Sequence, residues 1–141
     1  MITLLMVHLV ATWFMVGVIW MAQVVHYPLM AHVDPSHSTE FQRMHVERMG
    51  VLVAPIMLAE VASAVLLCFF LPFEMQSWPA WLGLGLLMTI WLVTLLFSLP
   101  SHEVLLRRFD AMVHRRLISS NVARVVLWTA RGLIATALVV S

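Results

Sequence analysis

The fold is decided by residues 2–25, which read ITLLMVHLVATWFMVGVIWMAQVV and contain no Asp, Glu, Lys or Arg. A transmembrane helix needs about 20 consecutive, mostly apolar residues to cross a bilayer. Three further runs are apolar over this length, at residues 49–73, 78–99 and 117–140. We therefore predict an all-α integral membrane protein, in which four transmembrane helices form one bundle and residues 1–141 form a single domain.

The composition agrees with a chain surrounded by lipid. Of the 141 residues, 62% are hydrophobic and 11% are charged, and the mean hydropathy is +0.98. Soluble domains carry about 25% charged residues, so these values exclude an ordinary soluble domain, a disordered segment and a nucleic-acid-binding domain. The single cysteine, Cys68, excludes a disulfide framework and the cysteine-rich metal motifs. The lipid bilayer is thus the first expected partner.

The connections between the runs differ in length. Residues 72–79 join the second run to the third as a tight turn, whereas residues 26–48 and 100–116 are longer and more polar. In the last of these, apolar side chains fall on one side of a helix and arginines fall elsewhere. We therefore predict a short cytoplasmic amphipathic helix over residues 100–116.

Arginine placement predicts the orientation. The two longer connections hold Arg43, Arg48, Arg107, Arg108, Arg115 and Arg116. Neither the short turn nor either end of the chain carries an arginine. Because basic residues accumulate in cytoplasmic loops, we predict a multi-pass protein of the cell (inner) membrane with both termini outside.

Three charged side chains fall inside the apolar runs, namely Glu60, Arg124 and Arg131. A charge at mid-membrane usually faces the bundle interior and has a partner. At 1.5 Å per residue, Glu60 lies ~16 Å into its run, and Arg124 and Arg131 lie ~10 and ~21 Å into theirs from the same side. We predict that Glu60 faces Arg131 or Arg124. Two interpretations stay open: a structural clamp alone, or a clamp that also belongs to a catalytic site, whose surplus positive charge binds an anionic group.

Other polar side chains form stripes at helical spacing. The stripe on the last run comprises His114, Asn121, Arg124, Trp128 and Arg131. The stripe on the third run comprises Trp91, Thr94, Ser98 and His102. Since polar stripes that face lipid would be costly, we expect them to converge in the interior, where helix bundles commonly hold ligand sites.

The histidines gather at the predicted cytoplasmic end, with His8 as the exception. Neutral imidazole binds haem iron, zinc and copper, and histidine also transfers protons. The candidates for cofactor binding are His8, His26, His45, His102, His114 and Asn121. No metal-binding spacing such as HExxH occurs, so haem b is one expectation and the identity of any metal stays open. Hydrogen bonding within the bundle is the alternative role for these side chains.

One short pattern resembles a haem-binding membrane family. His8-x4-Trp13-Phe14-x2-Gly17 is similar to the first helix of HemJ-type protoporphyrinogen oxidases, which are four-helix membrane proteins of similar length. The resemblance implies that a haem group binds through His8.

A second pattern resembles another four-helix family. Leu117-x3-Asn121-x2-Arg124 is similar to the last helix of the anthrone-oxygenase-like membrane proteins, which would place residues 26–28 and 47–49 at the cytoplasmic rim. Together the two resemblances imply a membrane-embedded redox or oxygenase-like site.

We therefore predict a small membrane oxidoreductase with a buried His/Glu/Arg site, which uses haem b or a metal ion and acts on a lipophilic molecule. In this hypothesis His8 with His45 or His102 would supply the ligands, while Glu60 and the two buried arginines orient a carboxylate, a quinone or a haem propionate. Two alternatives stay open: a non-catalytic subunit or assembly factor of a larger membrane complex, and a proton or small-solute conductor. A homo-oligomer or a membrane-complex partner fits each of these.

A reporter fused to the C-terminus tests the predicted orientation. Because the six arginines outside the runs favour a cytoplasmic location of the longer connections, we expect a reporter enzyme that works only outside the membrane to be active there. The same reporter inserted between residues 100 and 116 should be inactive. Activity of a cytoplasm-specific reporter at the C-terminus would contradict the orientation.

Overall fold

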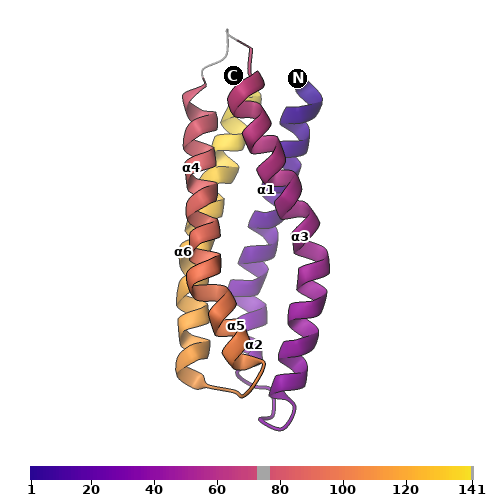
Figure 1. Ribbon diagram of the computed structural model, residues 1–141, viewed down its shortest axis with the longest axis vertical. Helices are drawn as coiled ribbons and strands as arrows, with labels where there is room; N and C mark the ends of the chain where they lie inside the picture. Colours follow the sequence, from indigo (N-terminus) through magenta and orange to yellow (C-terminus); the bar gives the residue numbers. More distant parts are fainter. Residues whose placement is uncertain (73–76, 141) are drawn as a thin grey trace.

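The computed structural model describes residues 1–72 and 77–140, and within these ranges every regular element is helical (Figure 1). The elements are α1 (Ile2–Met21), η1 (Ala22–His26), α2 (Tyr27–Met30), α3 (Ser38–Phe70), α4 (Trp78–Val93), η2 (Thr94–Ser98), α5 (Leu99–Leu105) and α6 (Ala111–Val140). The two η elements are π-helical segments. The all-helical character predicted from the sequence is confirmed for this part of the chain.

The helices form four long antiparallel rods. Because α1, η1 and α2 are continuous, as are α4, η2 and α5, the rods span Ile2–Met30, Ser38–Phe70, Trp78–Leu105 and Ala111–Val140. Each rod is long enough and apolar enough to cross a membrane. Both chain ends lie at one end of the bundle, which we call the terminal end, while α2 and α5 lie at the other, the loop end (Figure 1).

The amphipathic helix predicted over residues 100–116 is not a separate element, and this corrects the prediction. The third rod continues to Leu105, and α6 begins at Ala111. The carboxylate of Asp110 accepts hydrogen bonds from two backbone amides of the first turn of α6, at 2.9 and 3.2 Å. A side chain that satisfies these amides favours a helix start at that point. The helix therefore breaks at a capping residue inside the predicted segment.

The predicted turn over residues 72–79 falls partly on 73–76, outside the described residues. Between α2 and α3, the amide and hydroxyl of Ser36 donate hydrogen bonds to the Asp34 carboxylate. These bonds lower the pKa of this exposed carboxyl.

Both π-helical segments precede a proline. Pro28 follows η1, and Pro100 follows η2. Proline has no N–H to donate, and its ring crowds the carbonyl four residues earlier, which lies inside the π segment in each case. The wider π turn accommodates both effects, so each rod continues towards the loop end without a break.

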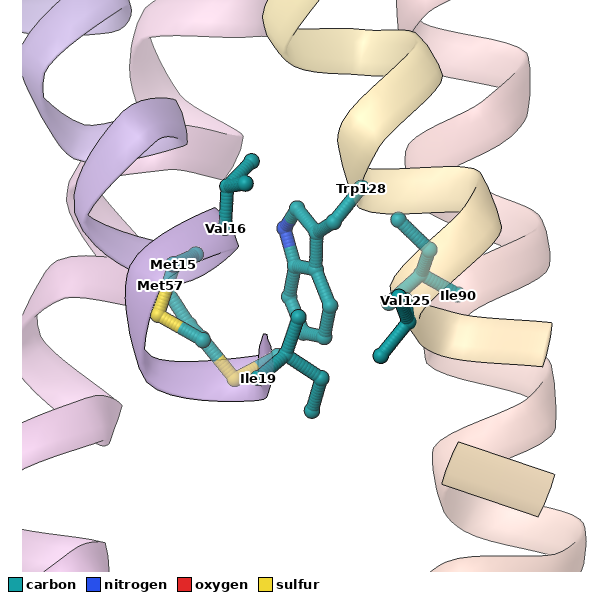
Figure 2. Close-up of a cluster of buried hydrophobic side chains, with 7 residues drawn as sticks. All are labelled: Met15, Val16, Ile19, Met57, Ile90, Val125 and Trp128. Atoms are coloured by element: carbon teal, nitrogen blue, oxygen red, sulfur yellow. The ribbon is translucent and has the colours of Figure 1, made fainter. Parts of the chain in front are cut away.

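The core has one large aromatic side chain at its centre. Trp128 of α6 is fully buried and lies between Met15, Val16 and Ile19 of α1 and Ile90 of α4 (Figure 2). Aliphatic and thioether groups thus surround the indole from two opposite rods. This packing holds α1, α4 and α6 together near the middle of the bundle.

The outer surface of the rods is also apolar. Val51 on α3 and Leu92 on α4, for example, are 81% and 56% exposed. A helix on the surface of a soluble bundle has a charged or polar outer face. An apolar exterior of this extent is what helices surrounded by lipid present.

Candidate functional site

A buried ion pair joins three of the four rods. Glu60 of α3 is fully buried, and its Oε1 lies 3.0 Å from Nη2 of Arg131 and accepts a hydrogen bond of 3.1 Å from Nε. The indole N–H of Trp128 donates to Oε2 at 3.1 Å, and Nη1 of Arg131 donates to the Gly83 carbonyl. The predicted pairing of Glu60 with Arg131 is confirmed, and it ties α3, α4 and α6 together. We call this group of residues the ion-pair layer.

His8 belongs to the ion-pair layer. Its Nδ1 lies 3.0 Å from Oγ of Ser63, and that hydroxyl donates a hydrogen bond of 3.1 Å to the Glu60 backbone carbonyl. The void beside His8 and Arg131 measures about 10 Å³, which is room for about one water molecule. The imidazole therefore has a structural partner, and a porphyrin does not fit beside it in this packing.

Between the ion-pair layer and the loop end lies a cavity of about 380 Å³. This volume lies within the range of small-molecule sites. The walls come from α1, α3 and the third rod, and they are mostly apolar: Met15, Ile19, Met49, Val53, Met57 and Leu95. α6 contributes Arg124.

The cavity opens sideways, between α3 and the third rod. Lining residues at this mouth are themselves exposed: Gly50, Ala54, Leu58, Leu95 and Leu99. Gly50 and Ala54 stand one helical turn apart and leave the mouth wide because neither has a long side chain. A Cβ added at Gly50 would meet no atom within 4 Å. In a membrane, this mouth would face the hydrocarbon of the lipid.

One end of the cavity, towards the loop end of the bundle, is polar. It is lined by Tyr27, His45, Ser98, His102 and Arg124. Tyr27 directly follows η1, and Ser98 ends η2, so the two π segments position both side chains. All four members of the predicted stripe on the third run line the cavity, which confirms that this stripe faces the interior.

Arg124 is buried at the polar end without an acidic partner. The side chain is 8% exposed, and its Nη1 donates to Oγ of Ser98 at 3.3 Å. It also interacts electrostatically with the Tyr27 hydroxyl, and its guanidinium carbon lies 5.3 Å from the ring centroid of Trp128. Its Nε has no hydrogen-bond partner, and no carboxylate lies within ion-pair distance of it, among the residues that the structure describes. Arg124 thus differs from Arg131, which has a carboxylate.

Three histidines lie in a row at the polar end. The ring centroids of His45 and His102 are 5.4 Å apart, and His26 stacks on the other side of His45 at 4.3 Å. The side-chain amide nitrogen of Gln42 lies 2.6 Å from Nδ1 of His102, within hydrogen-bond distance. Nδ1 of His45 is buried and has no partner within the described ranges. Of the three imidazoles, those of His45 and His102 line the cavity.

The remaining candidates for cofactor binding do not line this cavity. Asn121 donates to Oε1 of Gln23 at 2.9 Å and to the Ile19 carbonyl at 3.4 Å. The ring of His114 packs beside Phe109, with centroids 5.8 Å apart. His26 is separated from the cavity by His45. The structure thus brings His45, His102 and Arg124 together at the cavity, with His26 stacked on His45. The other candidates for cofactor binding lie apart from this group: His8, His114 and Asn121.

Sequence reasoning did not single out Tyr27 and Gln42. Tyr27 is the only tyrosine in the chain and precedes Pro28, a signal that could have marked it as a polar residue beside a widened helix. Gln42 lies about one turn before His45, on the same face of a helix. Both residues now connect the predicted candidates, Tyr27 to Arg124 and Gln42 to His102.

Comparisons with known proteins do not assign the chain to a family. The chain matches no protein-family model, no curated protein and no solved structure. Across residues 1–72 and 77–140, no group of three or more His, Cys, Asp and Glu side chains is arranged to hold a metal ion.

We predict that the two buried arginines differ in their contribution to stability. Arg131→Met should lower the free energy of unfolding by about 3 kcal/mol, because it leaves the Glu60 carboxylate buried without its partner. Arg124→Met should change it by less than about 1 kcal/mol, since an apolar side chain replaces a charge that has no acid to pair with. Reversible unfolding in mixed detergent micelles measures both values. An Arg124→Met variant as unstable as Arg131→Met would contradict the distinction.

Proposed function

We propose that the chain is a multi-pass protein of the cell membrane, with both termini outside, that binds a lipophilic small molecule in the cavity between α3 and the third rod. The observation that carries this proposal is the form of the cavity: about 380 Å³ with apolar walls, one polar end and a mouth on the lipid-facing surface. Such a space suits a molecule with an apolar body and one oxygen-bearing head group.

The polar end favours redox chemistry at that head group. Arg124, Tyr27 and Ser98 offer donors for an oxygen atom, while His45 and His102 can accept or return a proton. Conversion of a hydroquinone into a quinone releases two protons and two electrons. We infer that the imidazoles take up protons from such a molecule and that a redox partner in the membrane takes the electrons. The enzyme class proposed is an oxidoreductase for a quinone- or phenol-like lipid.

Haem b is the second candidate occupant. The imidazoles of His45 and His102 lie at the cavity and are the residues that would hold the iron, with Arg124 near them for a propionate. Bound haem would supply one-electron transfer. The role of His8 implied by the first resemblance does not suit this arrangement, because His8 lies in the ion-pair layer.

The other open functions gain less support. A proton conductor that titrates Glu60 would need this carboxylate to be available, yet Arg131 and Trp128 occupy both of its oxygens. A non-catalytic subunit would not need a cavity with unpaired imidazole and guanidinium nitrogens. We therefore favour the ligand-binding oxidoreductase.

We predict that a lipophilic molecule co-purifies with the chain and that a bulky side chain at the mouth excludes it. In mild detergent, an organic extract of the protein should contain about one quinone- or phenol-like molecule per chain, detected by mass spectrometry and ultraviolet absorption. Ala54→Trp should reduce this amount at least fivefold because the indole fills the mouth. Ala62→Trp is the matched control, since Ala62 is also exposed on α3 but does not line the cavity.

The visible spectrum of the same sample distinguishes the two occupants. A Soret band that Ala54→Trp or His45→Ala removes would identify haem b in place of the quinone-like lipid. If the protein contains neither molecule, and if Ala54→Trp and Ala62→Trp behave alike with added hydrophobic ligands, the proposed function is wrong.

A further inference from the structure

The charges inside the bundle do not balance. Glu60, Arg124 and Arg131 are the buried carboxylate and guanidinium side chains within the described ranges, so one carboxylate accompanies two guanidinium groups. Glu60 uses both of its oxygens on Arg131 and Trp128. An arginine cannot lose its proton in a protein. Arg124 therefore brings one positive charge into the interior that no side chain described here neutralises.

The partners of Arg124 are neutral. Ser98 accepts a hydrogen bond from the guanidinium, the Tyr27 hydroxyl interacts with it electrostatically, and the face of Trp128 covers it. These contacts satisfy part of the donor fork, but they supply no negative charge. Nε remains without a partner and belongs to a side chain that lines the cavity. An anion in the cavity would supply both the missing negative charge and an acceptor for Nε. A charged acceptor also forms stronger hydrogen bonds with guanidinium than a neutral one.

The surroundings of Arg124 restrict which anion can bind. Apart from its polar end, the cavity is lined by apolar side chains, and its mouth faces the exterior of the bundle between Gly50 and Leu95. A small inorganic anion would leave these walls uncovered and would have to cross an apolar surface to enter. A molecule with an anionic head group and a hydrocarbon body would neutralise the charge of Arg124 and would also cover the apolar walls.

We propose that Arg124 is the counter-ion for an acidic amphiphile, whose carboxylate or phenolate head binds at the polar end while its apolar body fills the cavity. This proposal rests on the proposed function and specifies its substrate class: the bound molecule is held as an oxygen anion. His45 and His102 lie beside Arg124 at the same end, and a head group that gives up its proton there leaves its negative charge against the guanidinium. Arg124 thus selects for acids over neutral lipids of equal length.

A coloured acid provides a direct test. 4-Octyl-2-nitrophenol has an apolar chain and a phenol whose ionised form absorbs visible light, and its methyl ether is a neutral control of nearly equal shape. In phosphatidylcholine nanodiscs that contain the full chain, we expect the phenolate to bind at least ~10-fold more tightly than the ether, as a charge-assisted hydrogen bond implies. The pKa of the bound phenol should fall by at least ~1 unit relative to empty nanodiscs, which is the same factor of ten.

Variants of Arg124 assign the effect to this side chain. Arg124→Gln should abolish the preference for the phenolate and the pKa shift, whereas Arg124→Lys should keep most of both. Dodecanoate should displace the phenolate, and dodecanol should not. If phosphatidylglycerol in the nanodiscs also displaces it, the natural anion is a lipid head group; if not, it is a free amphiphile, and either result supports an anion site at Arg124.

The outcomes separate this proposal from the proposed function. Equal binding of the phenol and the ether, with an unshifted pKa, would overturn the anion site while Ala54→Trp still reports a lipophilic cavity. Binding of neither probe to the wild-type chain, at concentrations that saturate the nanodisc lipid, would overturn both. The comparison between phenol and ether uses the wild-type chain, so it remains decisive even if Arg124→Gln fails to fold.

Discussion

The ion pair between Glu60 and Arg131 is the constraint on which the rest of the bundle depends. A charge in an apolar surrounding needs a partner, and here one carboxylate serves one guanidinium and one indole. The arrangement joins three rods and uses both carboxylate oxygens. Arg131 and Trp128 engage both oxygens of Glu60, so Arg124 has no share in this carboxylate. The interaction that holds the bundle together therefore leaves the Arg124 guanidinium available to a molecule in the cavity.

The bundle combines a closely packed half with a hollow one. In the ion-pair layer the void beside His8 holds about 10 Å³, whereas the cavity towards the loop end holds about 380 Å³. Trp128 separates the two regions: its indole N–H faces Glu60, and its ring faces Arg124. The π segments before Pro28 and Pro100 border the hollow half. The closely packed layer that holds the rods together and the cavity that can admit a molecule thus follow one another along the bundle.

The sequence predicted the four helices because an apolar run of bilayer length has few alternatives. It did not predict their ends at the loop end, since these depend on a cap at Asp110 and on π turns that absorb two prolines. Depth along the helices predicted that Glu60 meets a buried arginine. That Glu60 pairs with Arg131 and not with Arg124 depends on the Gly83 carbonyl and the Trp128 indole, which bind Arg131 and Glu60. The depth of a residue along its helix does not predict these two contacts. An interior site where the polar stripes converge was expected, but the volume and the mouth of the cavity and the place of Tyr27 in it were not, because they arise from the packing of side chains on different rods.

The central claim is that the two buried arginines have separate roles, one in the bundle and one towards a bound acid. The Nε nitrogen-15 resonances of Arg124 and Arg131, assigned by substitution and observed in nanodiscs, test it most directly. On addition of dodecanoate, we expect the Arg124 resonance to shift as its Nε gains a partner, while the Arg131 resonance stays in place because Glu60 already holds it. A shift of Arg131 with no change at Arg124 would contradict the account.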